Sequence, residues 1–183
     1  MMRVCVVEFH FPEWDRSSAD LRLTELVRLL LGDGHSVTFL ADINNDHRFR
    51  SELEKMGVEC VSAQQIGFFT SYASRLDFFR RHSFDAVVFQ SYMMYRYFAP
   101  SFRALQPEAR LVLDTTDLAF VRLEREAELS DDPARKEEAA KEKADELAAI
   151  RDADSVWTVT ERERQIVLGM HPEKDTHVIT NIH

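Results

Sequence analysis

Residues 110–129, RLVLDTTDLAFVRLEREAEL, decide how the rest of the chain is interpreted. Residues 110–113 form a short apolar run with a β-branched valine, which is typical of a buried strand. The polar residues 114–117, DTTD, follow, and Leu118 and Val121 then open an apolar period within a strongly charged stretch. This pattern predicts a strand, a polar turn and an amphipathic helix. Because ligands of open α/β sheets bind just beyond the carboxyl ends of the strands, the turn is the first candidate site.

The same turn has a simpler interpretation. Thr116 or Asp117 can serve as the N-cap of the following helix, a role that these residue types commonly fill. The two roles do not exclude each other, so both stay open.

Composition restricts the class of protein. A chain of 183 residues, 45% of them hydrophobic, suits one domain with a substantial core. Its net charge of -9 repels phosphate backbones, which argues against nucleic acid as a partner. The two cysteines, Cys5 and Cys60, are too few for a disulfide scaffold and favour a reducing compartment. Neither a signal peptide nor an apolar run of ~20 residues is present, so we expect a cytoplasmic protein.

Segments with strand-like and helix-like patterns alternate along the chain. Such alternation indicates βαβ units with a parallel sheet and right-handed crossovers. We therefore expect an α/β, Rossmann-like domain of three layers with a mostly parallel sheet of about seven strands. The expected strands are residues 3–9, 36–41, 58–61, 86–89, 110–113, 155–159 and 176–180. The expected helices are residues 21–31, 48–56, a segment of unclear start within 64–82, 93–105 with an interruption near Pro100, a helix from Leu118, 133–151 with a solvated charged face, and 162–170.

Several common chemistries lack their motifs. No G-x-G-x-x-G follows the first strand and no G-x-x-x-x-G-K-[ST] occurs, so neither a dinucleotide site nor a P-loop is supported. The cysteines have no C-x-x-C spacing and H-E-x-x-H is missing, which argues against zinc. The absence of G-x-S-x-G excludes an α/β-hydrolase. We therefore expect no cofactor and no metal.

The topology gathers polar residues at one edge instead. Side chains that follow parallel strands should face one crevice, and this set suits a hydroxyl-rich ligand such as a sugar. A carboxylate or a histidine there can act as general base on a sugar hydroxyl. The residues are Glu8, His10, Gln90, Ser91, the turn 114–117, Thr160 and Glu161. The alternatives are a His10 that only bonds a backbone group, and Tyr92 and Tyr95 that only pack against the helix layer.

Four stretches together resemble a known family. They are PEWDRSSADLRLTELVRLL, GDGHSVTFLAD, LVLDTTDLAFVRLEREAEL, and ADSVWTVTERERQIV followed by HVITNIH. In this order they resemble the N-terminal domain of bacterial family-four retaining glycosyltransferases of the GT-B fold, most closely those of O-antigen or other surface-polysaccharide synthesis. The resemblance covers nearly the whole chain.

The resemblance implies a two-lobed enzyme. Residues 1–183 would form the N-terminal, acceptor-side half of the GT-B fold, and a C-terminal donor-binding lobe carrying the family's E-x7-E pair would lie outside this chain. The implied partners are a nucleotide-sugar donor, bound mainly by that second lobe, and a glycan or lipid-linked acceptor. Peripheral contact with the inner face of a membrane is also implied, and the fragment alone is expected to be inactive.

The resemblance also assigns site residues. Asp117 is expected to be catalytic, and Arg22 is placed near an anion at the first loop. Ala19 replaces a glycine, and Ala119 a histidine, that relatives often carry, so a degenerate, non-catalytic domain that binds glycan or protein is the alternative. The expected substrate-binding residues are His10, Asp15, Ser18, Arg22, Ser91, Asp114, Thr116, Thr160 and Glu161.

Overall fold

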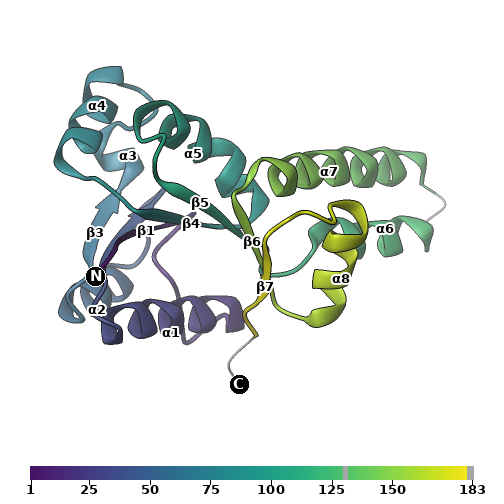
Figure 1. Ribbon diagram of the computed structural model, residues 1–183, viewed down its shortest axis with the longest axis horizontal. Helices are drawn as coiled ribbons and strands as arrows, with labels where there is room; N and C mark the ends of the chain where they lie inside the picture. Colours follow the sequence, from purple (N-terminus) through teal and green to yellow (C-terminus); the bar gives the residue numbers. More distant parts are fainter. Residues whose placement is uncertain (130–131, 181–183) are drawn as a thin grey trace.

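The computed structural model describes residues 1–129 and 132–180 and contains one seven-stranded sheet (Figure 1). All neighbouring strands pair in parallel, in the order β3-β2-β1-β4-β5-β6-β7. This confirms the predicted α/β, Rossmann-like architecture. The strands are β1 (Arg3–Glu8), β2 (Ser36–Ala41), β3 (Glu59–Ser62), β4 (Ala86–Gln90), β5 (Arg110–Asp114), β6 (Ser155–Thr158) and β7 (Thr176–Val178).

Helices cover both faces of the sheet. Helices α1 and α2 lie on one face, and α3, α4, α5 and α7 lie on the other (Figure 1). The strand order reverses between β1 and β4, and in doubly wound sheets the crevice at such a switch point is where ligands bind. The helices are α1 (Ser18–Gly32), α2 (His47–Lys55), α3 (Ala63–Ile66), α4 (Tyr72–Arg81), α5 (Tyr92–Leu105), α6 (Ala119–Glu128), α7 (Pro133–Asp152) and α8 (Glu161–Met170).

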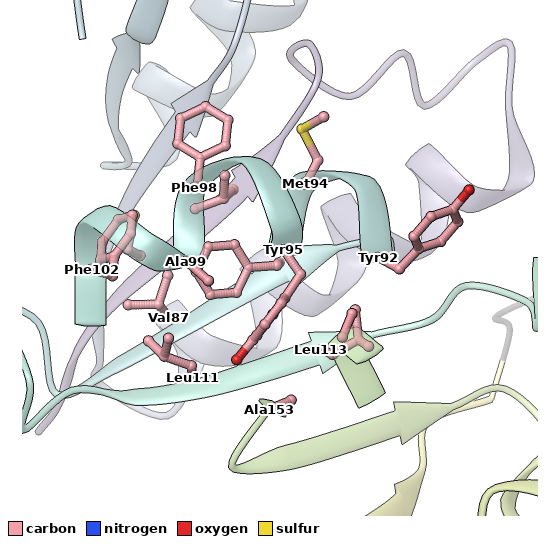
Figure 2. Close-up of a cluster of buried hydrophobic side chains, with 14 of the residues drawn as sticks. Val87, Tyr92, Met94, Tyr95, Phe98, Ala99, Phe102, Leu111, Leu113 and Ala153 are labelled. Carbon is pink, nitrogen blue, oxygen red and sulfur yellow. The ribbon is translucent and has the colours of Figure 1, made fainter. Parts of the chain in front are cut away.

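Side chains alternate between two cores along each strand. In β1, Val4 and Val6 pack on the α1 side, whereas Cys5 and Val7 pack on the α5 side. Figure 2 shows α5 lying over β4 and β5, with Tyr95 extending toward Ala153. Burying such side chains contributes about 1.5–3 kcal/mol each, and this double coverage explains why the strands are nearly continuous apolar runs.

Two helix predictions need correction. The segment 64–82 is not one helix, because Gly67 ends α3 in the left-handed conformation, at a φ of 68°, and α4 begins only at Tyr72. Phe68 is fully buried between them and anchors the connection. Pro100 does not interrupt α5, which runs through it. Pro100 lies on the exposed face, where water can satisfy a carbonyl left without its helical partner.

The last strand is shorter than predicted. β7 ends at Val178, although Ile179 N still donates to Thr158 O, and residues 181–183 of the predicted linker approach lie outside the described residues. Among the described residues, no helix is both long and apolar enough to span a bilayer.

Candidate functional site

Three polar residues lie side by side where β1, β4 and β5 end. Gln90 is the register partner of Asp114, and Glu8 follows Val7, the partner of Phe89. Successive side chains of a strand point to opposite faces of the sheet. Glu8, Gln90 and Asp114 therefore point to the same face as the valines of their own strands that pack against α1. The end of each central strand therefore presents a polar group at the switch point.

Asp114 is held by a buried ion pair. Arg22 Nη1 lies 2.6 Å from Asp114 Oδ2, and the two side chains are 1% and 0% exposed. Arg22 also donates to the Ile179 carbonyl from Nε and Nη2, at 3.2 and 3.0 Å. The arginine thus ties α1 to the end of β5 and to the chain after β7. Neither side chain is open to a ligand in this structure, which corrects the placement of Arg22 near a bound anion and gives Asp114 a supporting role.

Burial perturbs both acids at these strand ends, because it raises the pKa of Asp114 as well as that of Glu8. Burial raises the pKa of Glu8 to about 8, and the carboxylates of Asp20 and Asp114 add to the shift, while the Phe9 backbone N–H opposes it. Its Oε2 atom is covered and has no hydrogen-bond partner among the described residues. A carboxyl group near its pKa at neutral pH can both give and take a proton.

Gln90 provides a second unpartnered oxygen beside it. Its Oε1 atom is buried without a partner in the described part of the chain, whereas Nε2 donates to Thr116 Oγ1 at 3.4 Å. Buried polar atoms are normally paired, so two orphaned acceptors on adjacent strand ends require an explanation. A ligand hydroxyl or a water bridging Glu8 and Gln90 would satisfy both.

Backbone strain marks the same edge. Within the described ranges, Ser91 and Thr116 are the non-glycine residues with positive φ, at 82° and 59°. Ser91 has a ψ of 155°, a region that is almost restricted to glycine, and its N–H donates to the Asp114 carbonyl at 2.8 Å. Asp117 N donates to Thr115 O at 2.6 Å, closing a tight three-residue turn around Thr116. Such strain concentrates at functional sites.

Asp117 stands exposed at the end of this turn. Its side chain is 55% exposed, and its carboxylate lies 3.6 Å from Arg122 Nε. The N-cap of α6 is Leu118, which provides no side-chain bond. The prediction that Thr116 or Asp117 caps the helix is therefore wrong. The tight turn around Thr116 delays the start of α6, so that Leu118 occupies the N-cap position.

Glu146 of α7 caps α6 instead. Its carboxylate accepts from Ala119 N at 3.2 Å and from Phe120 N at 2.8 Å. Burial raises the pKa of Glu146 to about 7, against the lowering effect of these two N–H groups. Sequence reasoning missed this residue by treating the charges of 133–151 as a solvated face. Glu146 lies seven residues after the buried Ala139 and four before the buried Ile150, and this helical spacing indicates that it lies on the buried face of α7.

A groove of about 410 Å³ lies beside Asp117, between α6 and α8. Thr160 reaches the groove while its hydroxyl forms a capping box with Glu163. Glu161 is exposed and engaged by Arg164 and Gln165. The lining residues are Asp117, Leu118, Val121, Arg122, Arg125, Glu126, Leu129, Thr160, Arg162, Glu163 and Ile166.

The first-loop residues lie apart from this groove. His10 Nδ1 is 3.0 Å from the Phe11 carbonyl, so the backbone-bonding alternative describes it. Asp15 pairs with Arg48 of α2 at 2.8 Å. Ser18 is the exposed first residue of α1, whose N-cap is Ser17. Within the described ranges, no hydrogen bond or ion pair joins these residues to Asp117, and none of them lines the groove beside it.

Two further expectations concern packing and metals. Tyr92 and Tyr95 are buried, and the Tyr95 hydroxyl donates to Asp152 Oδ2 at 2.8 Å, which confirms their packing role. Across residues 1–129 and 132–180, no group of three or more histidine, cysteine or acidic side chains is arranged to hold a metal ion.

Comparison with known proteins identifies the fold. No family model matches the chain, and no curated protein matches it in sequence. Among solved structures, it is similar to a UGT transferase from Siraitia grosvenorii in complex with UDP, with a TM-score of 0.56 and 12% identity. The match covers 97% of this chain and 51% of that protein, so the chain spans about half of its length. The chain thus shares its Rossmann-like α/β fold with about half of that structure.

Proposed function

We propose that this chain is the N-terminal, acceptor-binding domain of a retaining glycosyltransferase of surface-polysaccharide synthesis. In this proposal the full enzyme moves a sugar from a nucleotide-sugar donor to a glycan or lipid-linked acceptor, in the cytoplasm at the inner face of the membrane. A second lobe outside residues 1–183 binds most of the donor. This division into two lobes is supported by the match to a transferase in complex with UDP, because the chain covers only about half of that protein.

The observation that carries the proposal is the pair of unpartnered oxygens at the switch point. Glu8 Oε2 and Gln90 Oε1 both lack a partner in the described part of the chain, and the strained residue Ser91 follows Gln90 directly. A sugar offers hydroxyl groups that can donate to an oxygen such as Gln90 Oε1 and can donate to or accept from the Glu8 carboxyl group. Holding an acceptor hydroxyl in place supplies the positioning that a transfer reaction needs.

Asp117 is the proposed catalytic residue on this side. Its carboxylate is exposed on a tight turn, between the strand end and the groove lined by α6 and α8. There it can orient the acceptor hydroxyl or receive its proton. Thr160 lines the same groove, and Thr116 directly precedes Asp117. Both are proposed substrate contacts, together with Ser91. Stabilising the leaving phosphate falls to the second lobe.

The proposed contacts also include the first loop. His10 is only partly buried, and Asp15 and Ser18 are exposed, so each remains reachable by a ligand. Glu161 is reachable in the same way beside Thr160. Arg22 and Asp114 act indirectly, by holding the strand end that carries the Thr115–Thr116 turn.

The test is sugar transfer by the complete gene product with a panel of nucleotide sugars and glycan acceptors. Asp117→Asn should lower the transfer rate about 100-fold or more, the usual loss for a general base. Glu173→Gln is the matched control, because Glu173 is an exposed carboxylate in the connection that leads into the opposite end of the sheet. Equal rates for Asp117→Asn and wild type would remove Asp117 from the mechanism.

A non-catalytic glycan-binding or protein-binding domain is the second candidate. The specific observation behind it is Ala119, whose methyl side chain cannot hydrogen-bond a sugar and whose N–H already donates to Glu146. This candidate predicts glycan binding by the complete gene product without transfer from any nucleotide sugar. Transfer with any donor would exclude it.

A further inference from the structure

The groove between α6 and α8 contains two arginines whose side chains have no partner. Arg125 of α6 and Arg162 of α8 are exposed, and both line this groove of about 410 Å³. Across residues 1–129 and 132–180, neither guanidinium group takes part in an ion pair, a side-chain hydrogen bond or a cation–π contact. An unpaired guanidinium group presents a planar fork of N–H donors that matches the oxygens of a phosphate or a carboxylate. Each wall of the groove therefore offers one unused anion contact.

The acidic side chains of the groove are already engaged by other groups. Arg122 lies 3.6 Å from Asp117 and 3.4 Å from Glu126. Glu163 accepts hydrogen bonds from the backbone N and the Oγ1 of Thr160, at 3.0 and 2.9 Å. The described lining residues thus hold their carboxylates in local contacts and leave the two unpaired arginines available to an anion from outside the chain.

Helical spacing brings these arginines to the walls that meet. Val121, Arg125 and Leu129 are spaced four residues apart and lie on one side of α6, and Ile166 follows Arg162 by four residues on α8. The first turn of α8 also lines the groove, and the positive end of its dipole favours a negative charge there. Apolar side chains beside the arginines reduce contact with water, which strengthens an ionic interaction.

Asp117 lines the same groove at some distance from the arginines. Helix α6 begins at Ala119, and a rise of about 1.5 Å per residue places Arg125 about 9 Å further along its axis. The Asp117 carboxylate repels an anion, so the anion is favoured at the arginine end of the groove. This separation suits a ligand in which a phosphate group and a reacting hydroxyl lie on different sides of a sugar ring.

We propose that Arg125 and Arg162 bind a phosphate or diphosphate group of the acceptor, so that a hydroxyl of the sugar attached to it faces Asp117. The acceptor class is thus a sugar joined to phosphate, which gains affinity over the same sugar without the charge. The acceptor role of this ligand rests on the proposed function, whereas phosphate binding itself requires no transferase activity.

The test is an NMR titration of the ¹⁵N-labelled chain, followed at the amide signals of Val121, Arg125 and Arg162. The probes are α-D-glucose 1-phosphate and its uncharged counterpart, methyl α-D-glucoside. The phosphate should bind about tenfold more tightly than the uncharged sugar, and its binding should weaken when salt is raised from 50 to 500 mM. Arg125→Gln and Arg162→Gln should each weaken phosphate binding about tenfold and leave the binding of methyl α-D-glucoside unchanged.

Arg80→Gln is the matched control. Arg80 is exposed and unpaired among the described residues, and it lies in the last turn of α4, as Arg125 does in α6. Helix α4 is well separated from α6 and α8 (Figure 1). The control should bind the phosphate as wild type does. The proposal is overturned if Arg80→Gln weakens binding as much as Arg125→Gln, or if α-D-glucose 1-phosphate does not shift the groove signals. It is also overturned if Arg125→Gln lowers the melting temperature without changing phosphate binding, because that result describes an arginine that only complements the helix dipole.

A second set of probes identifies the source of the phosphate. UDP that shifts the groove signals at lower concentration than α-D-glucose 1-phosphate would assign the groove to the donor and overturn the acceptor assignment. Phosphate binding by a complete gene product that transfers no sugar would support the anion site and contradict the proposed function. Transfer without any phosphate binding in the groove would support the proposed function and overturn the anion site.

Discussion

Replacing Glu146 tests whether a residue on the neighbouring helix α7 positions the turn that carries Asp117. The Glu146 carboxylate is the cap of α6, because Leu118 supplies none. Removing a side-chain cap costs about 1 kcal/mol, and leaving the buried Phe120 N–H without an acceptor adds about 1–3 kcal/mol. Glu146→Ala should therefore lower the free energy of unfolding by roughly 2–4 kcal/mol at pH 5.5. Glu138→Ala, at an exposed site on the same helix, should change it by less than about 0.5 kcal/mol.

The contribution of Glu146 also depends on pH. Its folded pKa of about 7 lies above the ordinary value of 4.5, so the folded state binds the proton more tightly than the unfolded state does. This stability is fully present below pH 4.5 and is lost as the pH rises through 7. The loss amounts to about 3 kcal/mol at most. Glu146→Gln keeps one acceptor oxygen and has no such proton, so its unfolding free energy should lack this component.

The assay combines urea unfolding at pH 5.5 and 8.5 with hydrogen exchange of residues 118–124. Comparing wild type with Glu146→Gln at both pH values isolates Glu146 from the other acidic groups. We expect exchange in 118–124 to accelerate in Glu146→Ala and to remain near wild type in Glu138→Ala. A stability difference between wild type and Glu146→Gln that is the same at both pH values would refute the reasoning, as would unchanged exchange in Glu146→Ala.

Three other substitutions probe the strand ends. Glu8→Gln should stabilise the protein relative to wild type by at most about 5 kcal/mol at pH 9 and by little at pH 4, because the raised pKa of Glu8, about 8, makes stability fall as the pH rises from 4.5 through 8; urea unfolding at both pH values checks this. Arg22→Met leaves Asp114 buried and unpaired and should lower the free energy of unfolding by about 3–5 kcal/mol. The double variant Arg22→Met/Asp114→Leu should recover much of this loss. Equal unfolding midpoints for the single and double variants would contradict the role of the ion pair. Ser91→Gly relieves a conformation with a φ of 82° and should raise stability by about 1 kcal/mol in thermal unfolding, and a clear loss of stability would contradict the assigned strain.

The sequence predicts the strands well because each is a buried apolar run. Both faces of the sheet are covered by helices, so residues such as those of β2 (Ser36–Ala41) are apolar on both sides and end abruptly at polar turns. Segment 64–82 was harder to assign. Its aromatic residues lie both in the core, as Phe68 does, and on the exposed surface, as Phe69 does, and this mixture obscures the helical period.

The sequence locates the candidate site at one edge of the sheet but does not predict the contacts within it. Topology brings polar strand ends to one edge, which correctly groups Gln90 with Asp114. Capping by Glu146 and pairing by Arg22 were not predictable, because they join residues 26 or more positions apart, whereas local capping rules consider only the nearest few. The positive φ of Ser91 has no signal in its residue type.

We propose that the carboxyl edge around Glu8, Gln90 and Asp117 binds a glycan acceptor. An NMR titration of the ¹⁵N-labelled chain with a panel of oligosaccharides and, separately, nucleotide sugars tests this binding. An oligosaccharide should shift the amide signals of Phe9, Ser91 and Asp117, while those of Leu29 and Glu173 on other surfaces should stay unchanged. Shifts confined to residues away from this edge, or no shift with any oligosaccharide, would contradict it.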